Sequence, residues 1–179
     1  MGGIKIRQIE EQDIEQVLAI YAPYITDTLI TFEETVPSAE AFRKRVQKIT
    51  ARYPWLVCEA EGSVVGYAYA GPYRERAAYD FTCELSVYVV QGWHSRGIGS
   101  LLYERLLQEL RERGFVNAYA VITVPNAQSE ALHRHFGFRE EGRSRQIGYK
   151  MNTWCDVAYL SKRIGEGKRD ADGKWIRPW

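Results

Sequence analysis

The feature that most constrains the fold of this chain is a strand-like run that leads through two glycines into a helical pattern. Residues 83–90, CELSVYVV, are β-prone, and leucines at helical spacing follow from Leu101 to Leu110. Gly97 and Gly99 lie between the two patterns. Glycine lets an anion approach the free N–H groups of a helix's first turn, so the segment is a candidate phosphate site. A tight turn or a plain connecting loop would use the same glycines, and all three interpretations stay open at this point.

Two common phosphate motifs do not fit this segment. The G-x-x-x-x-G-K-[ST] loop of nucleoside triphosphatases does not occur in it. The dinucleotide fingerprint G-x-G-x-x-G fails because Leu102 follows where a third glycine would fall. Arg96 adds a positive charge immediately before the glycines. A phosphate site here therefore needs support from a second segment of the chain.

The sequence predicts one α+β domain over residues 1–164 and a polar C-terminal tail over residues 165–179. The strands predicted from apolar alternation and turn residues are 4–9, 55–60, 63–71, 84–90, 116–124 and a region that ends by 160, and the predicted helices are 13–24, 38–49, 101–114 and 126–136. Because a helix separates the strands at 84–90 and 116–124, we expect them to form a parallel pair in a mixed sheet. The tail is expected to be mobile, or docked through Trp175 and Trp179.

Charge and cysteine usage narrow the functional classes. Lys plus Arg number 24 and Asp plus Glu number 23, so a net charge of +1 gives no general attraction to nucleic acid or to an anionic membrane. The sequence shows no secretory signal and no apolar run long enough to span a membrane. Cys58, Cys83 and Cys155 form no C-x-x-C pair, and we expect buried reduced thiols. Together these features predict a cytoplasmic protein without a metal site.

A second segment, PNAQSEALHRHFGF at residues 125–138, supports a phosphate site at the glycines. Together with His94-Ser-Arg-Gly97-Ile-Gly99, it resembles the GNAT superfamily of acetyl-CoA-dependent N-acetyltransferases. That family's pyrophosphate loop is Gln/Arg-x-x-Gly-x-Gly/Ala, and its second motif is Asn-x-x-Ser/Ala-x-x-Leu-Tyr-x-x-x-Gly-Phe. The chain departs from the family at two positions, where His94 replaces Gln or Arg and His133 replaces Tyr. The second departure removes a general-acid tyrosine from that position.

The resemblance extends over about residues 4–161 and is to the phosphinothricin N-acetyltransferase branch, which includes methionine sulfoximine and methionine sulfone acetyltransferases. In this branch a Glu precedes S/T-V-Y-V on the central strand and a His occupies the Tyr position, as Glu84 and His133 do here. The resemblance implies the GNAT fold. That fold has a mixed, mostly antiparallel central sheet with a splayed parallel pair, flanked by helices on both faces.

The resemblance also implies an activity. The expected activity is direct transfer of the acetyl group of acetyl-CoA to the α-amine of a small amino-acid analogue such as phosphinothricin. This is the reaction of herbicide resistance, and the enzyme is expected to be a homodimer. Methionine sulfoximine or methionine sulfone stays open as the acceptor. A protein acceptor fits less well, and a non-catalytic acyl-CoA sensor fits least because both Glu84 and His133 are present.

Glu84 is the expected general base, acting directly or through a water molecule. It lies on an apolar strand between Cys83 and Leu85, where burial would raise the pKa of its carboxyl toward the working pH. The alternative is a solvent-facing glutamate on an alternating strand. His133 is expected to assist catalysis or to orient a group, although a lone helical histidine is more often structural.

The remaining site residues follow from the same resemblance. Acetyl-CoA is expected to contact Val87, Tyr88, Val89, Ser95, Arg96, Gly97, Ile98, Gly99, Ser100 and Asn126, chiefly through backbone groups. The amino-acid substrate is expected to contact Phe32, Arg74, Arg76 and Tyr79. The alternative for Phe32 is an aromatic side chain of the core. The alternative for Arg74, Arg76 and Tyr79 is a solvated, charged loop without a role in binding. Residues 148–156 match the branch in pattern without an assigned role beyond packing, though Tyr149 and Lys150 could face the pocket.

Overall fold

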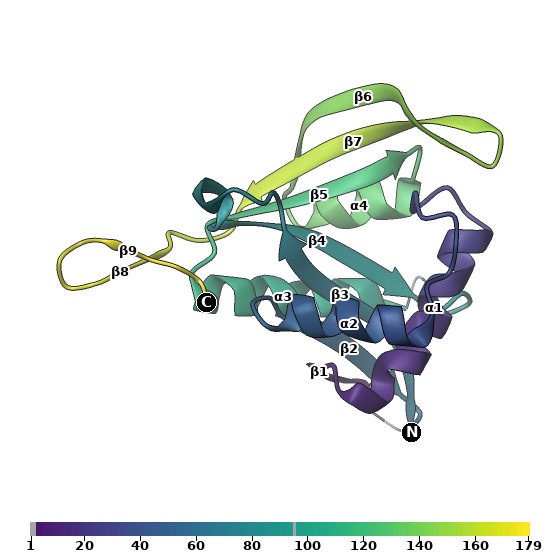
Figure 1. Ribbon diagram of the computed structural model, residues 1–179, viewed down its shortest axis with the longest axis horizontal. Helices are drawn as coiled ribbons and strands as arrows, with labels where there is room; N and C mark the ends of the chain where they lie inside the picture. Colours follow the sequence, from purple (N-terminus) through teal and green to yellow (C-terminus); the bar gives the residue numbers. More distant parts are fainter. Residues whose placement is uncertain (1–2, 95) are drawn as a thin grey trace.

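The computed structural model describes residues 3–94 and 96–179, which form a seven-stranded sheet covered by helices (Figure 1). The strands lie in the order β1-β2-β3-β4-β5-β7-β6, and β8 and β9 form a separate hairpin. The strands are β1 (Lys5–Gln8), β2 (Trp55–Ala60), β3 (Ser63–Pro72), β4 (Thr82–Val89), β5 (Asn117–Val124), β6 (Arg139–Lys150), β7 (Thr153–Arg163), β8 (Lys168–Arg169) and β9 (Trp175–Ile176). The helices are α1 (Ile14–Thr26), α2 (Ala39–Thr50), α3 (Ile98–Arg113) and α4 (Ala127–His135), with short 3-10 turns η1 (Glu11–Asp13) and η2 (Ala77–Tyr79).

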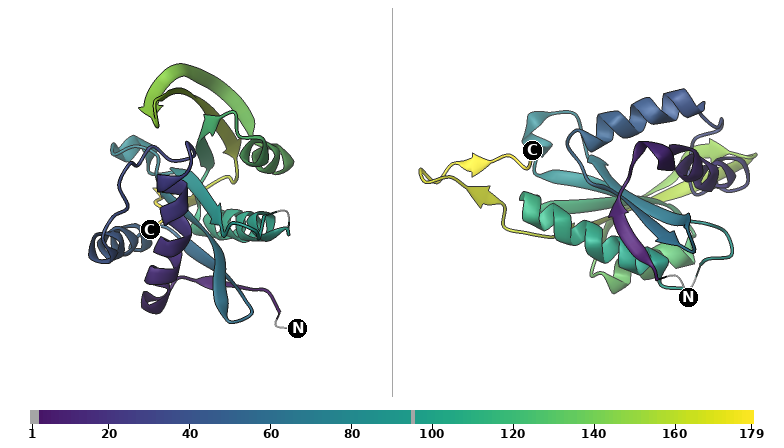
Figure 2. Two further views of the ribbon diagram at one scale, coloured as in Figure 1. Left: turned by 90° about the vertical axis from the view of Figure 1, so that its right-hand side faces the viewer. Right: turned by 90° about the horizontal axis from the view of Figure 1, so that it is seen from below.

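Helices cover both faces of the sheet, as expected (Figure 2). α1 and α2 lie on one face, where Phe42 and Trp55 belong to the buried core. α3 and α4 lie on the other face, and the leucines of α3 that recur at helical spacing, such as Leu102 and Leu106, are fully buried there. Apolar surface removed from water on both sides stabilises the sheet as the central layer.

The predicted parallel pair is formed by β4 and β5, and it is short. Only Thr82, Cys83 and Glu84 of β4 pair with Asn117 to Tyr119 of β5. Every other pair of neighbouring strands in the described part of the seven-stranded sheet is antiparallel. Beyond Glu84 the two strands continue without pairing to each other, which confirms the splayed parallel pair. Figure 1 shows them separating toward the end at which α1 lies.

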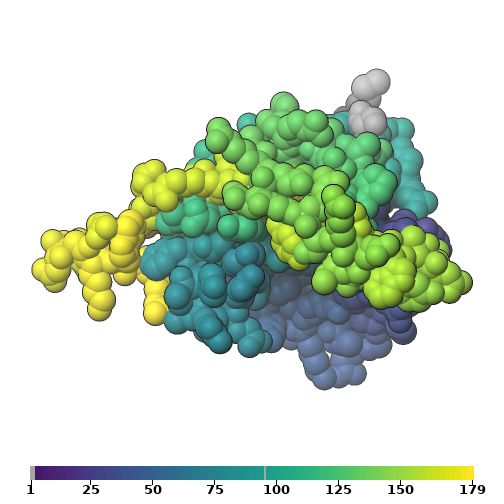
Figure 3. Space-filling model, turned by 90° about the horizontal axis from the view of Figure 1, so that it is seen from above, coloured from purple at the N-terminus to yellow at the C-terminus, as the bar shows by residue number. Residues whose placement is uncertain are grey.

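The sequence prediction was wrong about the last part of the sheet. A single strand region was expected to end by Leu160, whereas two long strands, β6 and β7, form an antiparallel hairpin and β7 continues to Arg163. β6 has the sequence REEGRSRQIGYK and is exposed along most of its length. Because it is an edge strand with register shifts, its charges and glycines give no alternating pattern. Figure 3 shows β6 and β7 crossing one surface of the molecule.

The C-terminal tail packs on the domain through its last residues, whereas its middle part extends away from the domain. Trp179 packs against the rings of Tyr53 and Phe115, with centroid distances of 5.8 and 6.0 Å. Arg177 forms an ion pair with Asp80, and the β8–β9 hairpin projects beyond this contact (Figure 3). The final residues therefore pack on the domain, while the hairpin stays exposed.

The cysteines behave as predicted, since Cys58, Cys83 and Cys155 are all buried and free. No helix in the described ranges is both long enough and apolar enough to cross a membrane.

Candidate active site

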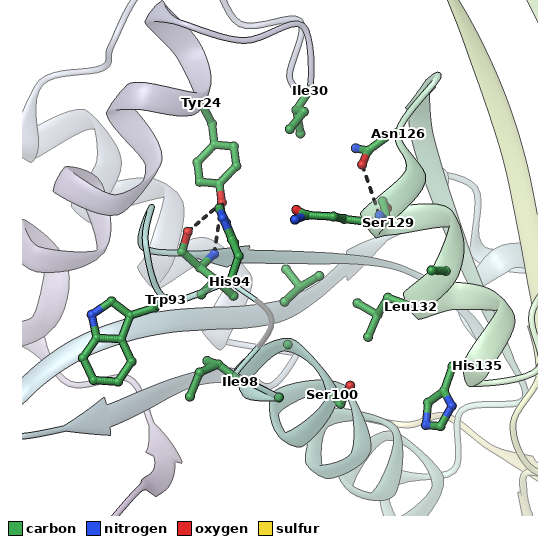
Figure 4. Close-up of a pocket in the computed structure, with 16 residues that line it drawn as sticks. Tyr24, Ile30, Trp93, His94, Ile98, Ser100, Asn126, Ser129, Leu132 and His135 are labelled. Atoms are coloured by element: carbon green, nitrogen blue, oxygen red, sulfur yellow. Dashed lines mark hydrogen bonds between the residues drawn. The ribbon is translucent and has the colours of Figure 1, made fainter.

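A cavity of about 440 Å³ lies where the end of β4, the start of α3 and the helix α4 meet (Figure 4). It collects residues that are far apart in the sequence, from α1 to α4. Its lining residues are Tyr24, Ile30, Val87, Val89, Trp93, His94, Gly97, Ile98, Gly99, Ser100, Asn126, Gln128, Ser129, Ala131, Leu132 and His135. Seven of the predicted coenzyme residues are among them, namely Val87, Val89, Gly97, Ile98, Gly99, Ser100 and Asn126.

The N-terminus of α3 has the conformation that an anion site needs. Gly97 is the N-cap residue with φ of +79°, and no side chain caps the helix there. The left-handed backbone at Gly97 strongly favours glycine. The first-turn N–H groups, which include those of Gly99 and Ser100, thus have no side-chain acceptor among the described residues, and they carry the positive end of the helix dipole. Arg96 immediately precedes Gly97, and its guanidinium carbon lies 4.6 Å from the ring centroid of Trp93.

Asn126 lies on the opposite wall of the cavity, at the N-terminus of α4. Its Oδ1 accepts a hydrogen bond from the backbone N–H of Ser129 at 3.1 Å, so Asn126 is the cap of α4 (Figure 4). The predicted residue therefore lines the cavity while its side-chain oxygen fixes the helix that forms the wall.

Tyr24 of α1 holds the end of β4 (Figure 4). Its hydroxyl donates to the carbonyl oxygen of Val89 at 2.6 Å and lies 3.0 Å from Nε2 of His94. A hydroxyl has one hydrogen, and Val89 takes it, so His94 is the donor to Tyr24. His94, the departure from the family's usual loop, thereby joins the glycine loop to α1.

The backbone of Val87 faces the space between β4 and β5. The backbone groups of Val89 point toward Tyr24 rather than toward β3, and antiparallel pairing alternates along a strand. Val87, two residues earlier, therefore points its backbone groups the same way, where pairing with β5 has already ended. This edge of β4 is available to the amides of an extended ligand.

Glu84 lies at the vertex of the split, because it is the last residue of β4 paired with β5. No hydrogen bond or ion pair of its carboxylate is found within the described residues. Burial raises the pKa of the Glu84 carboxyl above its ordinary value of 4.5. A half-buried carboxyl without a cationic partner among the described residues holds a proton more readily than an exposed one.

His133 of α4 is 2 % exposed and uses both ring nitrogens inside the protein. Nδ1 lies 2.7 Å from the carbonyl oxygen of Ser129, which can only accept, so Nδ1 carries the hydrogen. Nε2 then accepts from the hydroxyl of Tyr103, also at 2.7 Å. Burial lowers the pKa of His133 from its ordinary 6.5 and keeps the ring neutral. This geometry fits an orienting residue.

A second cavity, of about 60 Å³, occupies the split itself. Its walls include Leu85 to Tyr88 of β4, Val121 to Thr123 of β5, Tyr103, Asn126, Ser129 and His133. Ile30 lines this cavity as well as the larger one. Val87, Asn126 and Ser129 also line both cavities, so the shared wall combines the loop between α1 and α2 with β4 and the start of α4.

The predicted substrate residues do not line either cavity. Arg74 and Arg76 are exposed in the loop before β4, and the Arg74 guanidinium lies over the rings of Tyr73 and Tyr79, 5.2 and 5.6 Å from their centroids. Tyr73 in turn stacks on Tyr119 at 4.4 Å.

This stacking folds the loop beside the vertex of the split, since Tyr119 is the partner of Glu84 in β5. Phe32 is 41 % exposed and packs on Gly148 of β6 instead of joining the core.

Two predicted coenzyme residues are placed differently from the rest, and one is not placed. Tyr88 packs its ring edge-to-face against Tyr21 and Tyr24. Arg96 lies beside the cavity on Trp93. Ser95 is outside the described residues. Sequence reasoning missed Tyr24, because its contact with Val89 joins residues 65 positions apart and no local pattern announces it.

Comparison with known proteins shows which family shares this arrangement. Residues 6–158 match a family model described as an acetyltransferase (GNAT) domain. The chain is 38 % identical to the phosphinothricin N-acetyltransferase of Streptomyces viridochromogenes over 89 % of this chain and 87 % of that protein. It is 35 % identical to the L-methionine sulfoximine/L-methionine sulfone acetyltransferase of Pseudomonas aeruginosa, over 89 % of this chain and 94 % of that protein.

A solved structure agrees with these relatives. The crystal structure of a GNAT superfamily phosphinothricin acetyltransferase from Sinorhizobium meliloti in complex with AcCoA superposes with a TM-score of 0.90. It is 34 % identical in sequence, and the match covers 97 % of this chain and 93 % of that one.

Replacement of Tyr24 by Phe tests the link between α1 and β4. Tyr24→Phe leaves the Val89 carbonyl without its hydroxyl donor, and we expect a loss of about 1–3 kcal/mol in the free energy of unfolding. Urea unfolding followed by fluorescence measures this loss. Tyr159→Phe in β7 is the matched control, because its hydroxyl accepts only a long hydrogen bond from Ser144 at 3.4 Å in the described structure, and we expect a change below about 0.5 kcal/mol. Equal stabilities of the two variants would contradict the role of Tyr24.

Proposed function

The chain belongs to the GNAT acetyltransferase family, and we propose that it transfers the acetyl group of acetyl-CoA to the α-amine of a small amino-acid analogue such as phosphinothricin. One observation carries this proposal. The split between β4 and β5 has a helix terminus that begins at a left-handed glycine at its open end, and at its vertex a half-buried carboxyl that has no partner among the described residues. The helix terminus suits a polyanionic acyl donor, and the carboxyl suits an amine that must lose a proton.

The residues of the larger cavity fit acetyl-CoA. The first turn of α3, which follows Gly97, would supply N–H donors for the pyrophosphate, and Arg96 would supply a positive charge nearby. The backbone of Val87 is available to pair with the amides of the pantetheine arm. The Val89 carbonyl already accepts from Tyr24, so Val87 carries more of this pairing than the sequence suggested. Bound acetyl-CoA would supply the thioester carbonyl that the amine attacks.

Glu84 would act as the general base. The amine of an amino acid is mostly protonated near neutral pH, since its pKa is about 8 in a peptide and no lower than that in most free amino acids. Glu84, with its raised pKa, takes this proton directly or through a water molecule. The amine nitrogen then forms a bond to the acyl carbon, and the carbon–sulfur bond breaks to release the coenzyme A thiolate. A thiol pKa of about 8.5 lets the thiolate leave without a strong acid.

Backbone N–H groups of β4 that face the split would stabilise the oxyanion as it develops. His133, neutral and held by Tyr103 and Ser129, orients the wall of the split rather than exchanging protons with substrate. The loop before β4 lies beside Glu84, and there Arg74, Arg76 and Tyr79 would bind the carboxylate and the second acidic group of the acceptor.

Methionine sulfoximine and methionine sulfone are the alternative acceptors, because the Pseudomonas aeruginosa relative is named for them and is similar over as much of the chain. Both are small amino acids with a polar side-chain group. All three acceptors would bind in the same way, with Glu84 removing the proton of the α-amine and the loop before β4 binding the polar groups.

A thiol-release assay with acetyl-CoA tests the proposed reaction. We expect free thiol to form with phosphinothricin, methionine sulfoximine or methionine sulfone, and not with peptides that carry a free N-terminus. The assay detects the thiol with a chromogenic disulfide, and mass spectrometry identifies the N-acetyl product. Turnover with peptides alone would exclude the small-amino-acid proposal. Binding of acetyl-CoA without turnover on any amine would favour the sensor.

Replacement of Glu84 by Gln tests the base. We expect kcat to fall about 10²-fold or more, while the KM for acetyl-CoA changes little. In the wild type kcat should decline as the pH falls through the raised pKa of Glu84, above 4.5, because the protonated carboxyl cannot accept a proton. This acidic limb should be absent from the residual activity of the variant. Glu61→Gln in the exposed β2–β3 turn is the matched control, and unchanged turnover in Glu84→Gln would exclude the assignment.

We also propose a homodimer, in agreement with the branch that the sequence resembles. Four large apolar side chains gather at the exposed tip of the β6–β7 hairpin, namely Ile147, Tyr149, Met151 and Trp154. Exposed apolar clusters of this kind commonly mark protein interfaces. Trp179, by contrast, packs on Tyr53 and Phe115 of its own chain.

Light scattering tests the dimer. We expect twice the chain mass for the wild type and for Ile176→Asp, whose exposed side chain lies in β9, and a single chain mass for Trp154→Asp. A monomeric wild type, or a Trp154→Asp variant that stays dimeric, would exclude this interface.

A further inference from the structure

The loop between α1 and α2, residues 27–38, is fixed to β6 on the far side of the split. We propose that Gly148 and Lys150 form a clamp that holds this loop over the split and so restricts the acceptor to a small free amino acid. The inference rests on the proposed function, because it deepens the acceptor specificity of the same site. It is carried by two contacts, one polar and one steric, that join the loop to the last residues of β6.

The polar contact comes from Lys150. Its Nζ donates to the backbone carbonyl of Thr31 at 2.7 Å, and the residue is only 4 % exposed. A lysine this buried is uncommon unless its ammonium has a partner. Glu33 and Glu34, in the same loop, contribute favourable charge, although burial is the larger influence and lowers the pKa of Lys150. The ammonium therefore ties the end of β6 to the centre of the loop.

The steric contact comes from Gly148. Three ring atoms of Phe32 lie 2.9 Å or less from the point where a side chain at position 148 would begin, a separation that real Cβ atoms do not show. Gly148 does not have a positive φ, so its backbone would accept alanine without strain. Glycine is needed here only because the Phe32 ring occupies the space.

The clamp connects the two halves of the split sheet. Thr31 gives its carbonyl to Lys150, and its hydroxyl lies 2.8 Å from the hydroxyl of Tyr21 in α1. The ring of Tyr21 packs edge-to-face on Tyr88 of β4, at 4.9 Å. A continuous path of contacts therefore runs from β6, on the β5 side, through Thr31 to β4.

This path fixes Ile30, the neighbour of Thr31, which lines both cavities. With Ile30 held in place, we expect the cavity of about 60 Å³ in the split to stay too small for the continuing chain of a peptide acceptor. A loop released from β6 would widen it. The clamp is thus a positioning device, and its residues need not touch the reacting atoms.

A double-mutant cycle tests the steric half of the clamp. We expect Gly148→Ala to raise the KM for the best small amino-acid acceptor about tenfold or more, with the KM for acetyl-CoA within about twofold of the wild type. In a Phe32→Ala background the same change should add less than about twofold, because the clashing ring is gone. Gly142→Ala, on the same strand with open space around it and an ordinary φ, is the matched control. Additive effects of Gly148→Ala and Phe32→Ala would overturn the proposal.

Hydrogen exchange of residues 27–38 gives a readout that does not depend on turnover. We expect faster exchange in Gly148→Ala and in Lys150→Met, and wild-type exchange in Gly142→Ala, with thermal unfolding used to confirm that each variant is folded. Unchanged exchange in both clamp variants would overturn the clamp even in an active enzyme. If the wild type acetylates no amine, the proposed function fails, while the exchange data still decide whether the loop is clamped.

Discussion

The structure depends on the point at which β4 and β5 stop pairing. Three residues of each strand are joined, and beyond Glu84 the strands diverge. Buried N–H and C=O groups that lose a sheet partner need another one, because an unpaired backbone group is costly. Tyr24 provides that partner for Val89, and the rest of the edge faces the two cavities. The divergence thus creates both the space for a ligand and the backbone groups that can bind it.

The same geometry decides the environment of Glu84. A cation beside this carboxyl would lower its pKa and weaken it as a base, whereas burial without a cation raises it. Arg74, in the loop that folds beside the vertex, lies over the rings of Tyr73 and Tyr79 and makes no ion pair with Glu84 in the described structure. An arginine held on aromatic faces can thus lie in the loop beside Glu84 without lowering the pKa of that carboxyl, as the proposed role of Glu84 as a base requires.

The part of the site that could be predicted from the sequence is the part built from local pattern. The glycine loop follows from backbone requirements at Gly97, and the parallel pair follows from the order of strand, helix and strand. Tyr24 and Ile30 could not be found in this way, since they reach the cavity from another element through packing. β6 was missed because an exposed edge strand needs no apolar alternation, and with it the contact of Lys150 with Thr31 was out of reach.

Glu84 and His133 have pKa values that burial moves in opposite directions. Burial disfavours the charged form of each, so the pKa of the glutamate rises and that of the histidine falls. The hydrogen bonds of His133 add a geometric reason, because a protonated ring would make Nε2 a donor and the buried hydroxyl of Tyr103 would lose the acceptor that it has in the neutral form. Groups whose environments separate their pKa values commonly take different roles in one reaction. The lowered pKa and the two hydrogen bonds favour a neutral, fixed histidine, and the raised pKa favours Glu84 as the group that changes its charge in the proposed reaction.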